Sequence, residues 1–540
     1  MRLLLFALLA LAGVLRLSGL ATMPGFNGDE GYEAYYAWQV GEHFHIRLNP
    51  VRPYLGPYFL WLVAPAVAIA GETTPFVVRI VPALGGVAAV LVAFSIGRRW
   101  RDERLGLVLA ALFAVSAWAV GFQRVALSVM MLPLWTLSTV ALLLRAWDRR
   151  TPTAWFAVGA AMGVAAAFHP QGLLLGPAAA VATLAHPAAR SVVRSPRSIG
   201  AATLGFVATG WVVWAMVLDQ VGLGPGIDYS GTLITPELAR PLLERVPLSI
   251  PILLDVAAGP RVLRWFTGVE PSSLIAAWPA RLAVLAALGA GARAAFRDDD
   301  ATGRSLFGAL LVAWLLTAVR AADFDLAVVS RERYLLVAVT LTTLILGYGF
   351  SVLKPRARTA AVVGFALLQL ALLQEGFFGP YRADGGRAEP SMVAASPDAK
   401  LQAARWMLER LQPGEEGLVL AGDGWSYWPL VAFTAETMPM DFVPEDPADT
   451  AAILVRTRHR RRFLVDYPGW HWTEAIEAGL ATAGYATRPT FVPQTPDGRP
   501  ALVVWELPPE QAANEPQAPN RPSGLDAPGP GSVQPDQPQE

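Results

Sequence analysis

The chain has 540 residues, of which 54% are hydrophobic and only 16% charged, and its mean hydropathy is +0.40. A soluble globular protein of this size is far less apolar, so the composition predicts a protein embedded in lipid. Its 43 basic and 43 acidic residues cancel, which gives no reason to expect nucleic acid or another polyanion as a partner. The absence of cysteine excludes disulfides, thiol catalysis and cysteine-ligated metals.

The hydrophobic runs predict an α-helical polytopic membrane protein with about eleven transmembrane helices, since a bilayer core takes about 20 apolar residues per helix. We interpret the first run as an uncleaved span, because it is longer than the apolar region of a signal peptide and no clear cleavage site follows it. The eleven runs start near residues 3, 76, 105, 125, 154, 172, 200, 273, 305, 334 and 359.

Arginine and lysine set the predicted orientation. Five short basic connections fall on the same side of the span count, and the positive-inside rule makes them cytoplasmic. They are residues 98–104, 145–150, 186–197, 293–304 and 354–358. We therefore expect a multi-pass plasma-membrane protein with a cytoplasmic N-terminus.

Three long segments become extracytoplasmic on this topology: residues 22–75, 219–272 and 377–540. Residues 57–71 in the first are too few to span, which favours an interfacial or re-entrant helix.

The C-terminal part predicts a small extracytoplasmic α/β domain over residues 377–508. Residues 509–540 are rich in Pro, Gln and Gly and predict a disordered tail. The expected elements of the domain are helices at 403–414 and 472–485, strands at 416–422 and 461–467, and a closing hairpin of 487–492 with 501–507.

The segment 26–38, just outside the first span, is the strongest candidate for chemistry. Asp29 and Glu30 open a short predicted helix that places tyrosines on one face. A carboxylate at the boundary of water and lipid can act as general base toward an acceptor hydroxyl while a lipid-borne substrate lies alongside. Capping is the competing explanation, because the helix dipole stabilises carboxylates at a helix start.

Six arginines lie within or at the rim of the apolar runs, all in the predicted outer half: Arg16, Arg79, Arg124, Arg281, Arg320 and Arg333. An arginine within a span costs about 2.5 to 3.5 kcal/mol, so an anion is expected to compensate it. Snorkelling explains a single arginine, and salt bridges with Asp29, Glu30 and Glu33 are a structural explanation. For the set we favour a bound lipid phosphate or diphosphate.

Other features carry weaker signals. The middle of the predicted spans holds no carboxylate, which argues against an ion-coupled transporter. His169 lies at an outward junction of two spans, where a tight turn and a cavity contact are the alternatives. Aromatic residues in 422–428 and 467–472 are candidates for binding an acceptor saccharide or for membrane anchoring. His43 and His45 leave a divalent metal open, and no known nucleotide, zinc-protease or hydrolase motif stands out.

Four motifs in chain order resemble the GT-C glycosyltransferases (family 39 type) of the protein O-mannosyltransferase and aminoarabinose transferase kind. The resemblance covers roughly residues 1–380. The matching segments are 29–36 (DE-x-Y-Y), 78–84 with 97–99 (R-L-P-S-A-L … G-R-R), 123–126 (S-R-x-A-R) and 333–336 (R-Y-L-L).

The resemblance implies a GT-C-like transmembrane core, residues 1–376, that transfers a sugar from a polyprenyl-phosphate carrier with inversion. It makes Asp29 the general base and gives Glu30 the role of orienting acceptor or base. Such a transfer needs an acceptor in line with the leaving phosphate and cations that take up its charge. Arg124 and Arg333 are assigned to the phosphate, and the other expected substrate-binding residues are Arg79, Tyr334, Tyr35, Tyr36 and His169.

Two departures leave donor and acceptor identity open. Ser128 stands near where relatives often carry an acidic residue, and residues 168–172 replace the T-K-x-x-G common in bacterial relatives. The acceptor is therefore a glycan, a lipid or a protein. The alternative hypothesis is a non-catalytic carrier or transporter of lipid-linked glycans that uses the arginine rim to hold phosphate.

Overall fold

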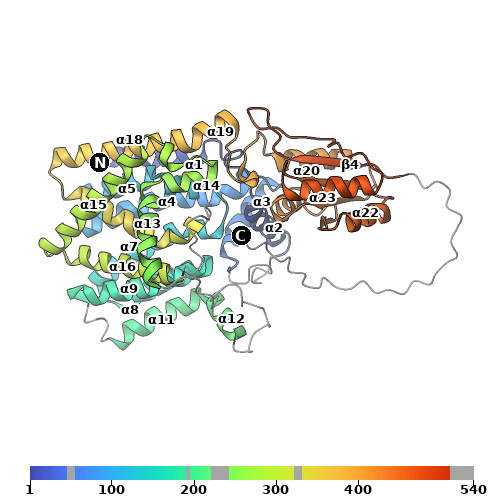
Figure 1. The fold of residues 1–540 in the computed structure, drawn as a ribbon. Coiled ribbons are helices and arrows are strands. Elements are labelled where there is room, and N and C mark those ends of the chain that lie inside the picture. Colours follow the sequence, from blue (N-terminus) through green and yellow to red (C-terminus); the bar gives the residue numbers. More distant parts are fainter. Residues whose placement is uncertain (45–54, 190–191, 193–194, 221–241, 321–330, 511–540) are drawn as a thin grey trace.

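The computed structural model describes residues 1–44, 55–189, 192, 195–220, 242–320 and 331–510. Long helices form one body, and an α/β module lies at one end of it (Figure 1). His45 and residues 511–540 of the predicted tail lie outside the described residues, as does the side chain of Arg320.

The helices of the body follow the predicted apolar runs in chain order, with α13 and α14 added in a segment predicted only as outward. They are α1 (Arg2–Leu17), α4 (Pro75–Trp100), α5 (Glu103–Val115), α6 (Ala117–Phe122), α7 (Leu132–Arg149), α8 (Pro152–Phe168), α9 (Leu175–Ala185), α11 (Pro196–Thr209), α12 (Trp211–Gln220), α13 (Leu242–Ala258), α14 (Pro260–Thr267), α15 (Ala277–Arg297), α16 (Ala301–Arg320), α17 (Leu336–Ser351) and α18 (Pro355–Leu373).

The helical membrane protein is confirmed, whereas the count of eleven spans stays a prediction. Within the described ranges, five helical stretches are long and apolar enough to cross a membrane: 75–100, 128–149, 301–318, 332–351 and 355–384. Most of the other predicted spans are shorter or interrupted, while α15 has 21 residues but is not among the stretches apolar enough to cross. Ser116, for example, leaves the helical conformation with ψ at 123° and separates α5 from α6.

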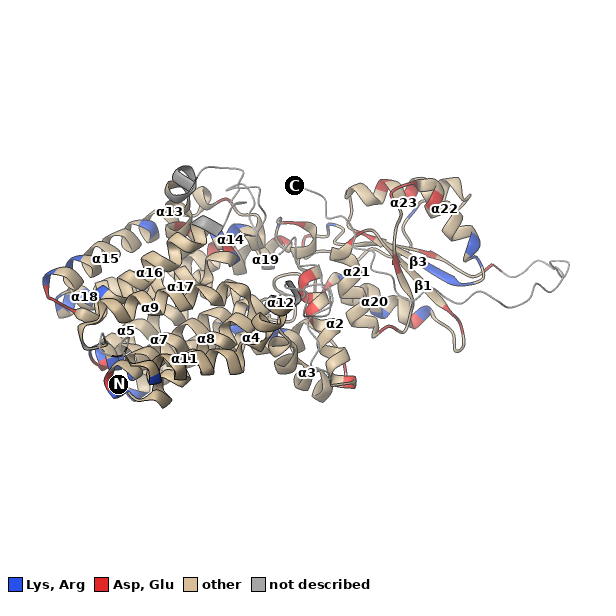
Figure 2. Ribbon diagram, turned by 90° about the horizontal axis from the view of Figure 1, so that it is seen from below, with Lys and Arg blue, Asp and Glu red and all other residues tan. Residues whose placement is uncertain are grey.

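Basic connections gather at the end of the body away from the module (Figure 2). Arg99 Nε donates to Asp148 Oδ2 at 3.0 Å, and Trp100 Nε1 donates to Asp300 Oδ2 at 3.2 Å. Trp100 also stacks on Tyr348 at the end of α17, with ring centroids 4.6 Å apart. Three of the five basic connections thus share one end, as predicted. Their cytoplasmic orientation stays a prediction.

The opposite end holds α2 (Gly28–Glu42) and α3 (Tyr58–Ala70), the short helix expected at 57–71. There α18 continues through a π-helical turn, Gln374–Phe378, into α19 (Gly379–Asp384), so the predicted boundary after residue 376 falls inside a continuous helix.

The module contains a four-stranded mixed sheet in the order β2-β1-β3-β4, in which β1 is parallel to β2 and β3 while β4 is antiparallel to β3. This confirms the predicted α/β module. The predicted hairpin is reduced to isolated bridges such as Phe491 with Val504. Its elements are β1 (Gly417–Ala421), β2 (Met440–Phe442), β3 (Arg461–Asp466), β4 (Val503–Leu507), α20 (Ala399–Arg410), α21 (Gly424–Thr434), α22 (Pro447–Arg456) and α23 (His471–Thr482).

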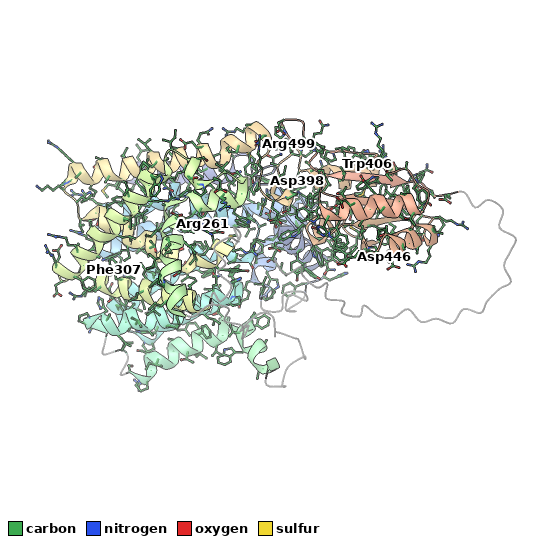
Figure 3. The ribbon with its side chains drawn as sticks, in the orientation of Figure 1. Arg261, Phe307, Asp398, Trp406, Asp446 and Arg499 are labelled. Atoms are coloured by element: carbon green, nitrogen blue, oxygen red, sulfur yellow. The ribbon has the colours of Figure 1, made fainter. Side chains whose placement is uncertain are left out.

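Residues 385–398, here called the strap, join α19 to the module and bind the first loop. Gly25 N donates to Met392 O at 2.9 Å, and Phe26 N donates to Asp398 Oδ2 at 2.8 Å. Figure 3 labels Asp398 at the junction of body and module. These bonds satisfy backbone groups that burial would otherwise leave unpaired, so the module is fixed to the loop that contains Asp29.

Helices α2 and α21 pack with little space between their backbones. A Cβ at Gly31 would lie 2.3 Å from Pro429 N, and a Cβ at Gly28 would lie 2.7 Å from Gly424 O. Only glycine permits this approach, which brings the first loop against the start of α21.

We expect Gly31→Ala to lower the thermal unfolding temperature and to expose the strap to protease, because the new methyl group forces the two helices apart. Overpacking of this kind costs about 1 to 3 kcal/mol. Gly41→Ala in the same helix is the control, since its nearest neighbour, Ala64 O, lies at an ordinary 3.7 Å. Equal unfolding temperatures for both variants would show that the contact between α2 and α21 is not tight.

Candidate active site

The N-terminus of α2 is closed by a capping box. Asn27 Oδ1 accepts from Glu30 N at 3.0 Å, and Glu30 Oε2 accepts from Asn27 N at 3.3 Å. This reciprocal pair satisfies two backbone donors that a helix start leaves unpaired. The capping explanation is therefore correct for Glu30, and it leaves Asp29 at the start of the first turn as the other carboxylate.

Glu30 also forms a fully buried ion pair with Arg79 of α4. Arg79 Nε and Nη2 donate to the two carboxylate oxygens at 2.7 and 2.6 Å, and both side chains are 0% exposed. Ala126 N donates to Glu30 Oε1 at 2.7 Å. The remaining N–H groups of Arg79 donate hydrogen bonds to the carbonyls of Leu20, Pro24 and Gly25. Its whole guanidinium thus has internal partners, and none of its N–H groups is left for an anion.

Arg124 holds the end of α1 and the start of the first loop. Nη1 donates to the carbonyls of Leu15 and Arg16, and Nη2 donates to those of Ser18 and Met23, at 2.8 to 3.0 Å. Since the side chain is fully buried, these carbonyl dipoles replace the anion that the sequence analysis expected. Both arginines lie beneath the loop and determine its shape.

Asp29 contacts a different arginine. Arg333 Nη1 donates to Asp29 Oδ2 at 3.2 Å, and the two side chains are 19% and 8% exposed. The Arg333 guanidinium also lies 5.9 Å from the ring centroid of Trp265 and 5.4 Å from that of Tyr334. Arg333 belongs to the 3₁₀ helix η5 (Arg331–Leu335) that precedes α17. The structure thus brings together two residues 304 positions apart that were predicted to share a site.

Two more carboxylates surround Asp29, and neither was predicted. Burial, followed by the charges of Asp29 and Asp423, raises the pKa of Glu389 in the strap to about 7. Burial also raises the pKa of Asp423, which caps α21 by accepting from Trp425 N and Ser426 N. Asp423 directly precedes Gly424, whose carbonyl touches Gly28 of α2. The module therefore contributes acidic groups beside Asp29.

The predicted tyrosines lie between α2 and the module. The rings of Tyr35 and Tyr36 are 6.0 and 6.2 Å from that of Trp428 in α21, and Tyr35 Oη donates to a carboxylate oxygen of Glu436. Burial raises the pKa of Tyr36 to about 12. Trp428, predicted as part of a saccharide platform, thus packs against the first loop.

His169 both forms a tight turn and lies near the candidate active site, which are the two alternatives that the sequence left open. Its Nδ1 accepts from Gln171 N at 3.2 Å, which caps the 3₁₀ helix η2 (Pro170–Leu174) as a turn residue would. Its ring centroid lies 5.9 Å from that of Tyr334, so it is also near Arg333. His43, the candidate metal ligand that the structure describes, caps the other end of α2. Across the described ranges, no group of three His, Asp or Glu side chains is arranged to hold a metal ion.

Sequence reasoning missed Glu389 and Asp423 because nothing local marks them. Glu389 stands in a loop between predicted elements, and Asp423 was noted only as part of an aromatic segment. A helix-capping pattern, Asp423 followed by Ser426 at the N3 position, is the signal that predicts the start of α21.

Comparisons with known proteins concern the family and the fold. A family model described as dolichyl-phosphate-mannose-protein mannosyltransferase matches residues 51–214. The fold is similar to that of ArnT from Cupriavidus metallidurans bound to undecaprenyl phosphate, with a TM-score of 0.59 and 14% identity over 95% of this chain and 99% of that one. The apo ArnT structure matches with the same score and identity, over 94% and 99%. Comparison with curated proteins gives no match.

An oligosaccharyltransferase of Archaeoglobus fulgidus in its apo form is also similar, with a TM-score of 0.53 and 14% identity over 88% of this chain and 71% of that one. At such identities the structural likenesses concern the fold. Together with the family model, they confirm the resemblance noted in the sequence. The family match over residues 51–214 and the shared fold are those of a membrane glycosyltransferase of the GT-C, protein mannosyltransferase type, which is what this chain resembles.

We expect Glu30→Gln to destabilise the protein strongly, because it leaves the buried Arg79 without a counter-charge. Breaking such a pair costs about 3 to 5 kcal/mol. Thermal unfolding of the purified protein is the measurement, and Asp148→Asn is the control, since its pair with Arg99 is largely exposed and is worth at most about 1 kcal/mol. Unchanged stability combined with lost activity would instead support a role for Glu30 in orienting substrate.

Proposed function

We propose that this protein transfers a sugar from a polyprenyl-phosphate carrier to an acceptor hydroxyl on the outer face of the plasma membrane, with inversion. The observation that supports this best is the contact between Asp29 and Arg333, a buried carboxylate and a cation that stays partly exposed. Inverting transfer needs such a pair, because a base must face the acceptor and a cation the leaving phosphate.

In this proposal, Asp29 accepts the proton of the acceptor hydroxyl while that oxygen forms a bond to the anomeric carbon. The bond from this carbon to the phosphate oxygen breaks, and its electron pair leaves with the polyprenyl phosphate. Arg333 stabilises the negative charge that develops on the phosphate. Tyr334 and His169 lie beside Arg333, since the Tyr334 ring contacts both the guanidinium and the His169 ring.

Glu30, Arg79 and Arg124 have positioning roles in the proposal. Their hydrogen bonds are all internal, so they fix the backbone from Leu20 to Glu30 and thereby the direction of the Asp29 side chain. A catalytic group must be held within a fraction of an ångström, which buried charge-assisted bonds achieve. We propose that the donor phosphate binds at Arg333 rather than at these buried arginines.

We assign transfer to residues 1–376 and acceptor selection to the module, residues 377–508. The module supports this assignment because the charges of both Asp29 and Asp423 act on Glu389, and the strap contacts the first loop directly. An acceptor that reaches Asp29 must therefore pass residues of both parts, whether it is a glycan, a lipid or a protein.

Asp29→Asn should lower the transfer rate by about 10²- to 10⁴-fold, the usual contribution of a general base. The measurement is sugar transfer in membranes supplied with polyprenyl-phosphate sugars. Glu42→Gln, an exposed change at the other end of α2, is the control. A near-normal rate for Asp29→Asn would reject the base and favour the carrier or transporter hypothesis.

The donor KM should rise as the pH increases through about 7, the pKa of Glu389. Below this pH Glu389 is neutral. Above it the side chain adds a negative charge beside Asp29 and repels an anionic donor. Glu389→Gln should abolish this rise because an amide does not titrate. A parallel rise of KM in the wild type and the variant would exclude Glu389 as its origin.

A further inference from the structure

A groove separate from the candidate active site opens between α1 and the helix formed by α18 and α19. Its volume is about 220 Å³. Val14, Leu370 and Leu373 form apolar walls, and Ser18, Gln374 and Arg382 supply polar groups towards the end of the body that carries the module. The groove thus changes from apolar to polar along its length, as a lipid molecule does.

Both helices expose large apolar side chains beside the groove. Phe6 and Val14 of α1 are 70% and 60% exposed, and Val363 and Leu367 of α18 are 51% and 61% exposed. A membrane protein turns such surfaces to the lipid, so the groove opens towards the bilayer.

Arg382 stacks on an aromatic ring and has no carboxylate partner among the described residues. Its guanidinium lies 5.5 Å from the ring centroid of Phe378, and it makes no hydrogen bond or ion pair with any part of the chain that the structure describes. Its neighbour Arg387 differs, because Arg387 Nε is paired with Asp384 Oδ2 at 2.8 Å. The stacking on Phe378 holds Arg382 at the rim while its N–H groups stay available.

Phe378 lines the groove and contacts two arginines. The guanidinium of Arg124 lies 5.2 Å from the centroid of this same ring, so the ring has a contact with a buried arginine as well as with Arg382. Arg124 in turn binds the carbonyls beneath the first loop. The π-helical turn Gln374–Phe378 places this ring where α18 passes into α19, and such turns are frequent at functional sites.

We propose that this groove binds an anionic glycerophospholipid, with its phosphate at Arg382 and an acyl chain between α1 and α18. Ser18 and Gln374 donate hydrogen bonds to the headgroup. A single arginine with two neutral donors matches the single charge of a phosphodiester. The carrier lipid of the transfer reaction belongs instead at Arg333, which is not among the residues that line the groove.

The test uses purified full-length protein in detergent, offered phosphatidylglycerol, phosphatidylcholine or undecaprenyl phosphate, with bound lipid counted by native mass spectrometry. We expect the wild type to retain phosphatidylglycerol in preference to the other two. Arg382→Gln should lower this retention about fivefold, which corresponds to the roughly 1 kcal/mol of one arginine near anionic lipid. Arg356→Gln, at the other end of the same long helix, should leave it unchanged.

Val14→Trp fills the groove without changing charge and should also lower lipid retention. This variant distinguishes binding within the groove from electrostatic attraction of the lipid to the positive rim. Equal losses in the Arg382 and Arg356 variants would overturn the proposal, as would full retention in Val14→Trp. Preferential retention of undecaprenyl phosphate would also overturn it, because the groove would then hold the carrier lipid. Thermal unfolding of both groove variants without added lipid is the control for folding. An unfolding temperature equal to that of the wild type attributes a lower lipid retention to the groove itself.

Discussion

The buried pair of Glu30 and Arg79 is the interaction on which the site depends. Two charges without solvent are costly unless each is fully hydrogen-bonded, and here each is. Glu30 accepts hydrogen bonds from Asn27 N, Ala126 N and the Nε and Nη2 groups of Arg79. Arg79 also donates to three carbonyls of the loop. The pair therefore joins α2, α4 and the chain before α7 at one point. This fixes the helix start from which Asp29 projects.

Asp29 occupies a place where separate parts of the chain meet: the first loop, η5, the strap and the start of α21. Arg333 opposes the carboxylates of Asp29 and Glu389, and Asp423 adds a further negative charge that acts on Glu389. A proton on Glu389 near neutral pH reduces this imbalance. The charge balance of the site is thus shared between the helical body and the module, which explains why the two are tied by backbone hydrogen bonds and by close contacts at Gly28 and Gly31.

Features set by local sequence were predictable. Apolar runs, basic connections and alternating strands of the module follow from hydropathy and periodicity, and the Asp29–Glu30 pair stood out at a helix start. What each charge touches was not predictable in this way, because partners such as Arg333 are fixed only by the tertiary fold. Arg79 and Arg124 illustrate the point: their positions indicated an anion site, yet carbonyls and Glu30 compensate them. Glu389 had no local signal at all.

The bond from Phe26 to Asp398 joins residues 372 positions apart. At roughly 5 to 20 residues per second, a ribosome needs on the order of 20 to 75 s to pass from one to the other. During this interval the first loop has left the ribosome, but the strap that contains Asp398 has not yet been synthesised. The contact between the first loop and the strap is therefore made late in biosynthesis, whereas the partners of Glu30 are already synthesised; a chain truncated before the strap carries Asp29, Glu30 and Arg79 but lacks this contact.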